Sequence, residues 1–276
     1  MTSISDITDK RPIGVFDSGI GGLTVAGSIA RRLPYERIVY YGDTAHLPYG
    51  EKSAKALRSY ADSIAGFLQE QSCKAIVIAC NSASAVAADG LRKSLGKSLP
   101  VVDVISPTAR MAARKYPQGS IGVIATKATV NSRIYARRIA RWAPDAKVRM
   151  LATPLLVAMI EEGFFNNNIS KAVIADYLSR SNLRNIDALI LGCTHFPLVK
   201  SEISGFLGDG IQVIDSTDVV ADALTEVLRE RKLLADAGGR LPTHRFFVSD
   251  LTPSFVQSTE IFFGKKLKLE RKDLWA

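Results

Sequence analysis

Two stretches of the chain share one pattern, and that pattern decides the expected fold. The first is Ala75-Ile76-Val77-Ile78-Ala79-Cys80-Asn81-Ser82, and the second is Ala188-Leu189-Ile190-Leu191-Gly192-Cys193-Thr194-His195. Each is a short apolar run that ends in a cysteine followed by small polar residues. Because an unbroken run rich in Ile and Val is typical of a parallel strand covered on both faces, we expect each cysteine where a buried strand gives way to a helix. This edge of the sheet is where α/β proteins bind ligands.

The two stretches belong to a longer internal repeat. Four pairs of landmarks recur at nearly constant spacing: Gly14 and Gly122, Gly50 and Gly163, Cys80 and Cys193, Val101 and Ile211. The segment 154–163 is expected to take the place of the loop that ends at Tyr49-Gly50. Such a repeat predicts an α/β fold of two similar lobes with mainly parallel sheets, related by a pseudo-two-fold axis. The active site is then expected in the cleft between the lobes, with the two cysteines facing each other.

The last part of the chain does not continue the second half of the repeat. Apolar periodicity predicts helices over 218–231 and 253–263, and strands over 245–248 and 266–270. We expect these elements to return to the first half and complete it. The first lobe is therefore predicted to span 1–105 and 216–276, and the second, inserted lobe to span 106–215.

Composition narrows the class of protein. Of the 276 residues, 47% are hydrophobic and 23% are charged, which is ordinary for a globular protein. No apolar run approaches the roughly 20 residues of a membrane-spanning helix. Residues 1–10 are polar and lack the apolar core of a signal peptide, so a cytoplasmic location is expected. The odd number of cysteines, three, fits a reducing compartment better than a disulfide framework.

The net charge of +9 comes largely from two basic clusters, within 133–149 and 265–272. Aromatic residues are not regularly interleaved between these charges, so solvated surfaces are favoured over a nucleic-acid interface. Neither a nucleic acid nor a membrane is expected as a partner. A basic protein does attract acidic small molecules. The sequence leaves a homodimer open.

The glycine-rich segment Gly19–Gly22 follows the first expected strand and precedes a helix. Such a turn can bind phosphate, but the spacing matches neither the dinucleotide-binding nor the P-loop pattern. We therefore expect no nucleotide cofactor. The glycines are interpreted instead as letting a small ligand approach the backbone beside Asp17. Cys73 lacks the small polar residue that follows the other two cysteines, and it is interpreted as structural.

Two thiols on opposite sides of a cleft suggest a specific chemistry. A helix N-terminus lowers the pKa of a thiol and also binds carboxylates, so Cys80 and Cys193 are expected to ionise readily. One thiolate and one thiol on opposite faces of a carbon can remove a proton from one face and deliver another to the opposite face. This is inversion of a stereocentre, and it runs in either direction if the two protonation states exchange.

Residues near the cysteines fit this interpretation. Asp17 is expected at the same level as Cys80, and His195 lies two residues after Cys193, so each could orient or deprotonate the nearer thiol. The remaining candidates supply groups suited to binding a carboxylate and an ammonium: Ser18, Tyr49, Gly50, Asn81, Ser82, Thr126 and Thr194.

Other interpretations of the cysteines remain open at this point. A buried cysteine is often just a small apolar side chain. Cys80, Cys193 and His195 could ligate zinc, although no C-x-x-C pair supports this. A redox dithiol is disfavoured because strand ends separated by a cleft need not come within bonding distance. Asp17 and His195 could each serve only as a helix cap.

Several motifs together resemble glutamate racemases, which form part of the aspartate/glutamate racemase superfamily. The resemblance extends over roughly 12–264, and the segments that carry it are Asp17-Ser18-Gly19-Ile20-Gly21-Gly22-Leu23-Thr24, Tyr41-Gly42-Asp43, Pro48-Tyr49-Gly50-Glu51-Lys52, Ala79-Cys80-Asn81-Ser82, Glu161-Glu162-Gly163, Gly192-Cys193-Thr194-His195-Phe196-Pro197 and Phe247-Val248-Ser249-Asp250. Each segment alone is weak evidence, and the set is specific.

This resemblance implies interconversion of L- and D-glutamate without a cofactor or metal, which supplies D-glutamate for peptidoglycan. It implies that Cys80 and Cys193 are the proton donors and acceptors, assisted by Asp17, Glu161 and His195. Glu161 is preferred to Glu162. Substrate contacts are implied for Asp17, Ser18, Tyr49, Gly50, Asn81, Ser82, Thr126, Thr194 and His195. The chain departs from the usual family pattern at Ser82, Ser84, Ala125 and Ala158.

Three rival functions are weighed against this one. The first is a racemase of the same superfamily that acts on aspartate or a hydantoin. The second is a related decarboxylase with a single cysteine, which would lack Cys193. The third is a two-lobed binding protein in which the cysteines are merely buried.

Overall fold

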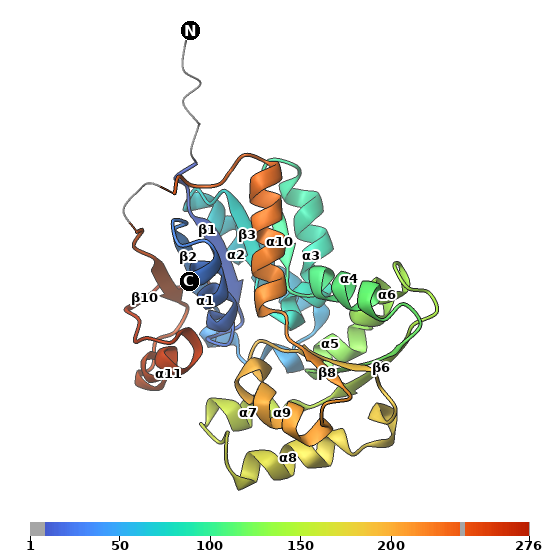
Figure 1. Ribbon diagram of the computed structural model, residues 1–276. Helices are drawn as coiled ribbons and strands as arrows, with labels where there is room; N and C mark the ends of the chain where they lie inside the picture. The colour runs from blue at the N-terminus through green and yellow to red at the C-terminus, as the bar shows by residue number, and fades with distance from the viewer. Residues whose placement is uncertain (1–8, 238–240, 276) are drawn as a thin grey trace.

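The computed structural model describes residues 9–237 and 241–275, and within them the chain forms two parallel sheets flanked by helices (Figure 1). The first sheet has the order β10-β9-β2-β1-β3-β4. Its strands are β1 (Ile13–Asp17), β2 (Ile38–Gly42), β3 (Ala75–Ile78), β4 (Val101–Asp103), β9 (Arg245–Val248) and β10 (Leu269–Arg271). The second sheet has the order β6-β5-β7-β8. Its strands are β5 (Ser120–Ala125), β6 (Lys147–Ala152), β7 (Ala188–Gly192) and β8 (Gln212–Ile214).

The two sheets repeat one topology. The order β2-β1-β3-β4 in the first sheet corresponds to β6-β5-β7-β8 in the second, and every pairing is parallel. Cys80 and Cys193 follow β3 and β7, which hold equivalent places in the two sheets. Both strands are completely buried, as their unbroken apolar runs predict. The predicted fold class, two similar α/β lobes with parallel sheets, is confirmed.

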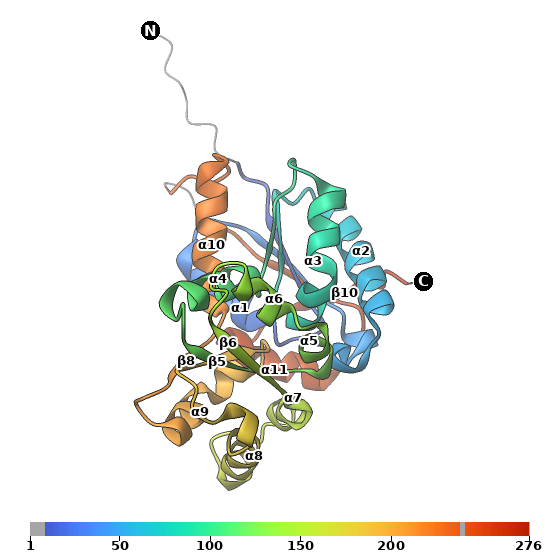
Figure 2. The ribbon, with the colours of Figure 1, turned by 90° about the vertical axis from the view of Figure 1, so that its right-hand side faces the viewer.

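Helices cover both faces of each sheet. The helices of the described chain are α1 (Leu23–Arg32), α2 (Ala54–Glu70), α3 (Asn81–Leu95), α4 (Ser106–Lys115), α5 (Lys127–Ser132), α6 (Ile134–Ala140), α7 (Pro154–Glu161), α8 (Asn168–Leu178), α9 (Lys200–Leu207), α10 (Thr217–Glu230) and α11 (Pro253–Phe263). On the first sheet, α2 and α3 pack on one face and α1, α10 and α11 pack on the other (Figure 2). Short 3₁₀ turns η1 (Thr44–His46), η2 (Tyr49–Glu51), η3 (Ser181–Leu183) and η4 (Phe196–Val199) lie between the longer elements.

The hydrophobic core is continuous between the lobes. One cluster of buried side chains contains residues of β1, α1, α4 and α10 together with β5 and β7. A second cluster lies between the first sheet and helices α2 and α3. Because the larger cluster includes both sheets, the lobes share apolar surface as well as two chain crossings.

The final segment of the chain adds β9 and β10 to the edge of the first sheet, beside β2. The strand expected over 266–270 is shorter and lies later, at Leu269–Arg271. The proposed lobe boundaries remain a prediction, and their first residues, 1–8, lie outside the described chain. No helix within residues 9–237 and 241–275 combines the length and hydropathy needed to cross a membrane.

Two segments of the second lobe differ from the expectations. The segment 154–163, matched to a loop in the first half, contains the helix α7, which begins with Pro154 in its first turn. The strand β6 was not expected, because its sequence Lys147–Ala152 contributes to a basic cluster. This strand lies at the edge of its sheet and is only partly buried, which explains its mixed composition.

Candidate active site

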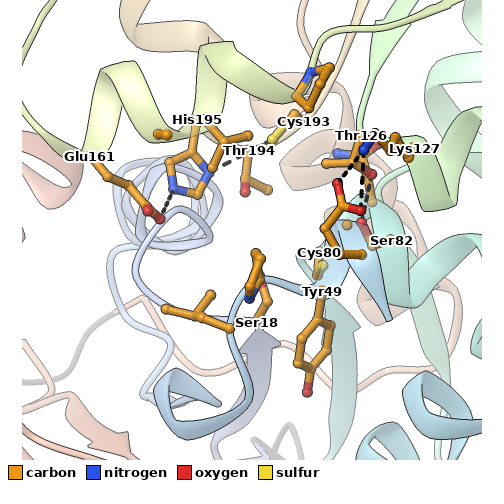
Figure 3. A pocket seen from close by; sticks show the side chains of 18 residues that line it. Ser18, Tyr49, Cys80, Ser82, Thr126, Lys127, Glu161, Cys193, Thr194 and His195 are labelled. Carbon is orange, nitrogen blue, oxygen red and sulfur yellow. Dashed lines mark hydrogen bonds and ion pairs between the residues drawn. The ribbon is translucent and has the colours of Figure 1, made fainter. Parts of the chain in front are cut away.

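A cavity of about 310 Å³ lies where residues that follow the strands of both sheets meet (Figure 3). Figure 3 shows Cys80 and Cys193 on either side of the open space. The cavity is lined by the following residues: Ser18, Leu47, Pro48, Tyr49, Gly50, Glu51, Cys80, Asn81, Ser82, Thr126, Lys127, Pro154, Val157, Ala158, Glu161, Cys193, Thr194 and His195. Every site residue predicted from the sequence is in this set except Asp17.

Cys80 occupies the junction between β3 and α3. It is the N-cap residue of α3, and its Sγ accepts a hydrogen bond from the Ala83 backbone N–H at 3.5 Å. Burial, and next the Asp17 carboxylate, raise the pKa of Cys80 to about 12, and the hydrogen bonds from the Ala83 N–H and Ser18 only partly oppose this rise. The N–H of the helix N-terminus does lower this pKa, but burial and Asp17 outweigh it, so the expectation that Cys80 ionises readily is wrong. At neutral pH Cys80 is a thiol.

Asp17 lies at the end of β1, directly behind Ser18. Its Oδ2 accepts hydrogen bonds from the backbone N–H groups of Gly19 (3.0 Å) and Gly22 (2.9 Å). Its Oδ1 is buried and has no hydrogen-bond partner among the residues of the described chain. Burial raises the pKa of Asp17, and nearby His195 and the two N–H groups oppose that rise. Asp17 is thus a buried carboxylate with one free oxygen beside Cys80.

Cys193, His195 and Glu161 form a relay on the side of the second lobe. His195 Nδ1 lies 3.7 Å from Cys193 Sγ, and its Nε2 lies 2.9 Å from Glu161 Oε1. Burial lowers the pKa of His195, but the contacts with Cys193 and Glu161 outweigh it and raise the pKa to about 10. Glu161 ends α7 and lines the cavity, whereas Glu162, the next residue, does not line it. The imidazolium of His195 places a positive charge beside Cys193 Sγ.

The glycine-rich turn has a role different from the one expected. A Cβ added at Gly21 would lie 2.4 Å from His195 Cε1, and one at Gly22 would lie 2.4 Å from Asp17 Cβ. The turn therefore admits these two side chains, rather than a ligand, against its backbone. It brings the Asp17 side of the first lobe next to the His195 side of the second.

Polar groups from α3 and the second lobe meet at another wall of the cavity. The Ser82 hydroxyl lies 2.8 Å from the Thr126 hydroxyl, a hydrogen bond between the lobes. The Tyr135 hydroxyl donates to Asn81 Oδ1 at 2.9 Å, also between the lobes. This leaves Asn81 Nδ2 buried, and it has no hydrogen-bond partner in the described part of the chain. An N–H donor left free at a cavity wall is suited to a carboxylate.

The sequence did not single out the residues that surround these groups. Lys127 of α5 and Glu51 form an ion pair between the lobes at 3.2 Å, and both line the cavity. Leu47 and the α7 residues Pro154, Val157 and Ala158 form an apolar part of the wall. Lys127 and Glu51 directly follow predicted site residues, and this adjacency was the available signal. Of the apolar α7 residues, only Ala158 was noted from the sequence, as a departure from the family pattern.

All three cysteines are free thiols. Within residues 9–237 and 241–275, no three His, Cys, Asp or Glu side chains are grouped so that they could hold a metal ion. The zinc interpretation therefore lacks a donor set in this part of the chain.

Comparison with known proteins agrees with the site. The model of the Asp/Glu/Hydantoin racemase family matches residues 23–224. The glutamate racemase of Neisseria gonorrhoeae is 43% identical over 265 residues, 96% of this chain and 97% of that protein. The crystal structure of glutamate racemase from Francisella tularensis in complex with D-glutamate has a TM-score of 0.90 and 41% sequence identity, and the match covers 97% of this chain and 99% of that one.

A more distant likeness concerns the fold alone. The aspartate racemase of Picrophilus torridus has a TM-score of 0.55 and 19% identity, covering 80% of this chain and 98% of that one. Two opposed cysteines, the matching family model and extensive identity over almost the whole length all point the same way. The chain belongs to the Asp/Glu/Hydantoin racemase family and is a racemase, similar to glutamate racemases over nearly its full length.

Proposed function

We propose that this racemase interconverts L- and D-glutamate without a cofactor, by proton transfer between Cα and two thiols. The observation that carries the proposal is the presence of Cys80 and Cys193 in one cavity, each after the equivalent strand of its sheet. Because the cavity lies between these sheets, a stereocentre held there has one sulfur on each side. That arrangement suits removal of a proton from one face and its return to the other.

The proposed reaction has two proton transfers. A thiolate on one cysteine removes the Cα proton, and the electron pair stays on the substrate as a carbanion. The thiol of the other cysteine then donates its proton to the opposite face of Cα and becomes the thiolate. The two cysteines have exchanged protonation states, so the product enantiomer can react in reverse.

The surroundings of the sulfurs support complementary roles. Protonated His195, held by Glu161, favours a thiolate on Cys193, whereas buried Cys80 keeps its proton. With a thiolate on Cys193 and a thiol on Cys80, the protein can react with one of the two enantiomers. Asp17 is the group that takes or orients the proton on Cys80 when the reaction runs the other way. Burial of Asp17, His195 and the two cysteines strengthens their electrostatic interactions with the carbanion.

The choice of glutamate rests on the comparisons and on the cavity walls. The solved structure from Francisella tularensis is a complex with D-glutamate, and the relatives reported above that match nearly the whole chain are glutamate racemases. Asn81 Nδ2, the Ser82 and Thr126 hydroxyls and the backbone at Tyr49-Gly50 provide donors for two carboxylates. Ser18, Thr194 and the free Oδ1 of Asp17 provide partners for an ammonium group.

We further propose that the reaction supplies D-glutamate for peptidoglycan, in the cytoplasm. The basis is the resemblance to glutamate racemases. A homodimer remains a prediction.

The purified protein should be incubated with each glutamate enantiomer in heavy water, and chirality and Cα hydrogen should be followed by polarimetry and NMR. We expect both enantiomers to give the racemic mixture with deuterium at Cα. A binding protein would leave the Cα hydrogen in place. Aspartate and a hydantoin, tested in parallel, should react far more slowly; preference for either would replace glutamate as the substrate.

A further inference from the structure

A buried carboxylate outside the cavity collects three side-chain hydrogen bonds. Asp43 follows β2 and is fully buried. Its Oδ1 accepts from the Ser249 hydroxyl at 2.9 Å, and its Oδ2 accepts from the Tyr49 hydroxyl at 2.6 Å. His46 Nδ1 lies within 3.0 Å of both oxygens. Burying a carboxylate is costly unless it is hydrogen-bonded, and these three contacts offset that cost for Asp43.

Asp43 is hydrogen-bonded to two parts of the candidate active site, the Asp17 backbone and the Tyr49 side chain. Its backbone N–H donates to the Asp17 carbonyl at 3.0 Å. Through Tyr49 it holds the segment 47–51, every residue of which lines the cavity. The Tyr49 side chain is buried, and its hydroxyl ends on Asp43. A single hydrogen bond therefore connects the carboxylate to the middle of a cavity wall.

This wall fits closely against the second lobe. A Cβ added at Gly50 would lie 2.9 Å from Thr126 Cβ, so the backbone there approaches α5 as closely as a glycine allows. A shift of about 1 Å in this segment would change both the cavity and the contact between the lobes. The short 3₁₀ turn η2 has few hydrogen bonds of its own, so contacts from other elements must anchor segment 47–51 in position.

His46 and Ser249, two of the partners of Asp43, make further contacts of their own. The His46 ring stacks on Tyr60 of α2 with centroids 4.3 Å apart and meets the edge of Trp275 at 4.7 Å. The Ser249 hydroxyl also accepts the Ala45 backbone N–H at 2.8 Å. The anchor thus draws on α2, on the end of β9 and on the C-terminal segment.

We propose that Asp43 is a positioning residue, which fixes the wall formed by 47–51 through the hydroxyl of Tyr49. The inference rests on the proposed function, because substrate binding is its readout. A carboxylate suits the position, since it accepts hydrogen bonds at both oxygens, whereas an amide presents donors on one side. Burial, and next the Asp43 carboxylate, raise the pKa of Tyr49, so its hydroxyl remains a donor over the working pH range.

The direct test is Tyr49→Phe, which removes the hydroxyl and keeps the ring. We expect KM for both glutamate enantiomers to rise about tenfold, as for loss of a buried hydrogen bond, with kcat changed by no more than about twofold. The matched control is Tyr116→Phe, which removes a tyrosine hydrogen bond to Gln212 (2.8 Å) far from the cavity and should leave KM unchanged.

The KM value separates positioning from general destabilisation. A variant that merely unfolds in part has fewer active molecules, which lowers apparent kcat and leaves KM unchanged. A lower kcat with wild-type KM in Tyr49→Phe overturns the proposal, and so does wild-type behaviour in both constants. Thermal unfolding of both variants provides the comparison of stability.

A double-mutant cycle tests whether Asp43 acts through Tyr49. Asp43→Asn should raise KM by a similar factor, and the double variant should be little worse than either single one, because both remove the same link. Additive effects on KM would contradict this. Wild-type protein is assayed first: if it does not racemise glutamate, the proposed function fails; if it does and Tyr49→Phe matches it, only the positioning role fails.

Discussion

The two cysteines of the cavity lie in different electrostatic surroundings, although they follow equivalent strands. Cys80 is next to the carboxylate of Asp17, which disfavours a thiolate. Cys193 is next to His195, whose pKa of about 10 makes it cationic at neutral pH. The pseudo-symmetric fold therefore carries an asymmetric pair of acid–base groups. Each sulfur has its own partner, and the partners determine how easily each direction starts.

Replacing these partners should slow turnover. We expect Asp17→Asn and His195→Asn each to lower kcat by about 10²-fold, the usual contribution of a positioned acid or base. The changes in kcat should differ between the two directions. The changes in kcat/KM should be equal, since enantiomers have equal free energies in achiral solvent. Progress curves from each pure enantiomer measure this; wild-type rates in both variants would remove the acid–base roles.

The raised pKa of His195 also predicts how stability depends on pH. Its folded pKa of about 10 exceeds the ordinary value of 6.5, so the folded state holds a proton that the unfolded state loses. The stabilisation is fully present below 6.5 and is lost as pH rises through 10. Urea unfolding should therefore show wild-type stability falling between pH 7 and pH 9. His195→Asn should show a smaller fall, the part due to Cys80 and Cys73, whose pKa values burial also raises; an equal fall would contradict the raised pKa of His195.

Sequence alone identified most of the cavity at the residue scale, because chemistry-bearing residues follow the apolar runs directly. Cys80, Asn81, Ser82, Cys193, Thr194 and His195 could be placed in this way. The pKa of Cys80 could not, since it depends on burial and on Asp17, which lies on another strand. Lys127 and Glu51 directly follow predicted site residues, but the ion pair between them joins the lobes, and no local pattern predicts that contact.

At the scale of elements, the glycine-rich turn between β1 and α1 is a close contact between the two sides of the site. The absence of a side chain at Gly21 lets His195 approach from the second lobe, and the absence of one at Gly22 leaves room for Asp17. The sequence predicted a permissive turn but assigned the freed space to a ligand. The occupant could not be known, because it comes from a segment more than 170 residues away along the chain.

A methyl group at this turn should disrupt the relay. In Gly21→Ala the new Cβ would meet His195 within 2.4 Å and displace it from Cys193 and Glu161, so we expect activity to fall at least about 10²-fold. The control is Gly66→Ala in α2, where no atom lies within 4 Å. It should keep full activity and stabilise the protein by about 0.5–1 kcal/mol. Equal activities of the two variants, at equal folded fractions, would contradict the account.

Elements with strong periodicity were predictable, and those shaped by tertiary position were not. The buried strands β3 and β7 appear as unbroken apolar runs, and α2 as an amphipathic pattern. By contrast, β6 is an edge strand that contains charged residues. The apolar sequence of α7 is compatible with a short helix, and also with the loop that the internal repeat predicts at this position. Burial from neighbouring elements decides such cases.

At the scale of the whole molecule, the shared core predicts that the lobes unfold together. The only two tryptophans report on separate places: Trp142 follows α6 in the second lobe, and Trp275 contacts Tyr60 of the first lobe. In the variants Trp142→Phe and Trp275→Phe, the remaining tryptophan should give the same urea midpoint as circular dichroism of that variant. Separate midpoints would show lobes that unfold independently, despite the common cluster of buried side chains.

The most direct test of the two-thiol account is hydrogen exchange by Cys80→Ala and Cys193→Ala in heavy water. NMR should follow Cα hydrogen, and a chiral assay should follow configuration. We predict that both variants fold, that neither racemises glutamate, and that each exchanges the Cα hydrogen of at most one enantiomer, opposite in the two variants. Racemisation at the wild-type rate by either variant, or exchange of the same enantiomer by both, would contradict proton transfer from opposite sides.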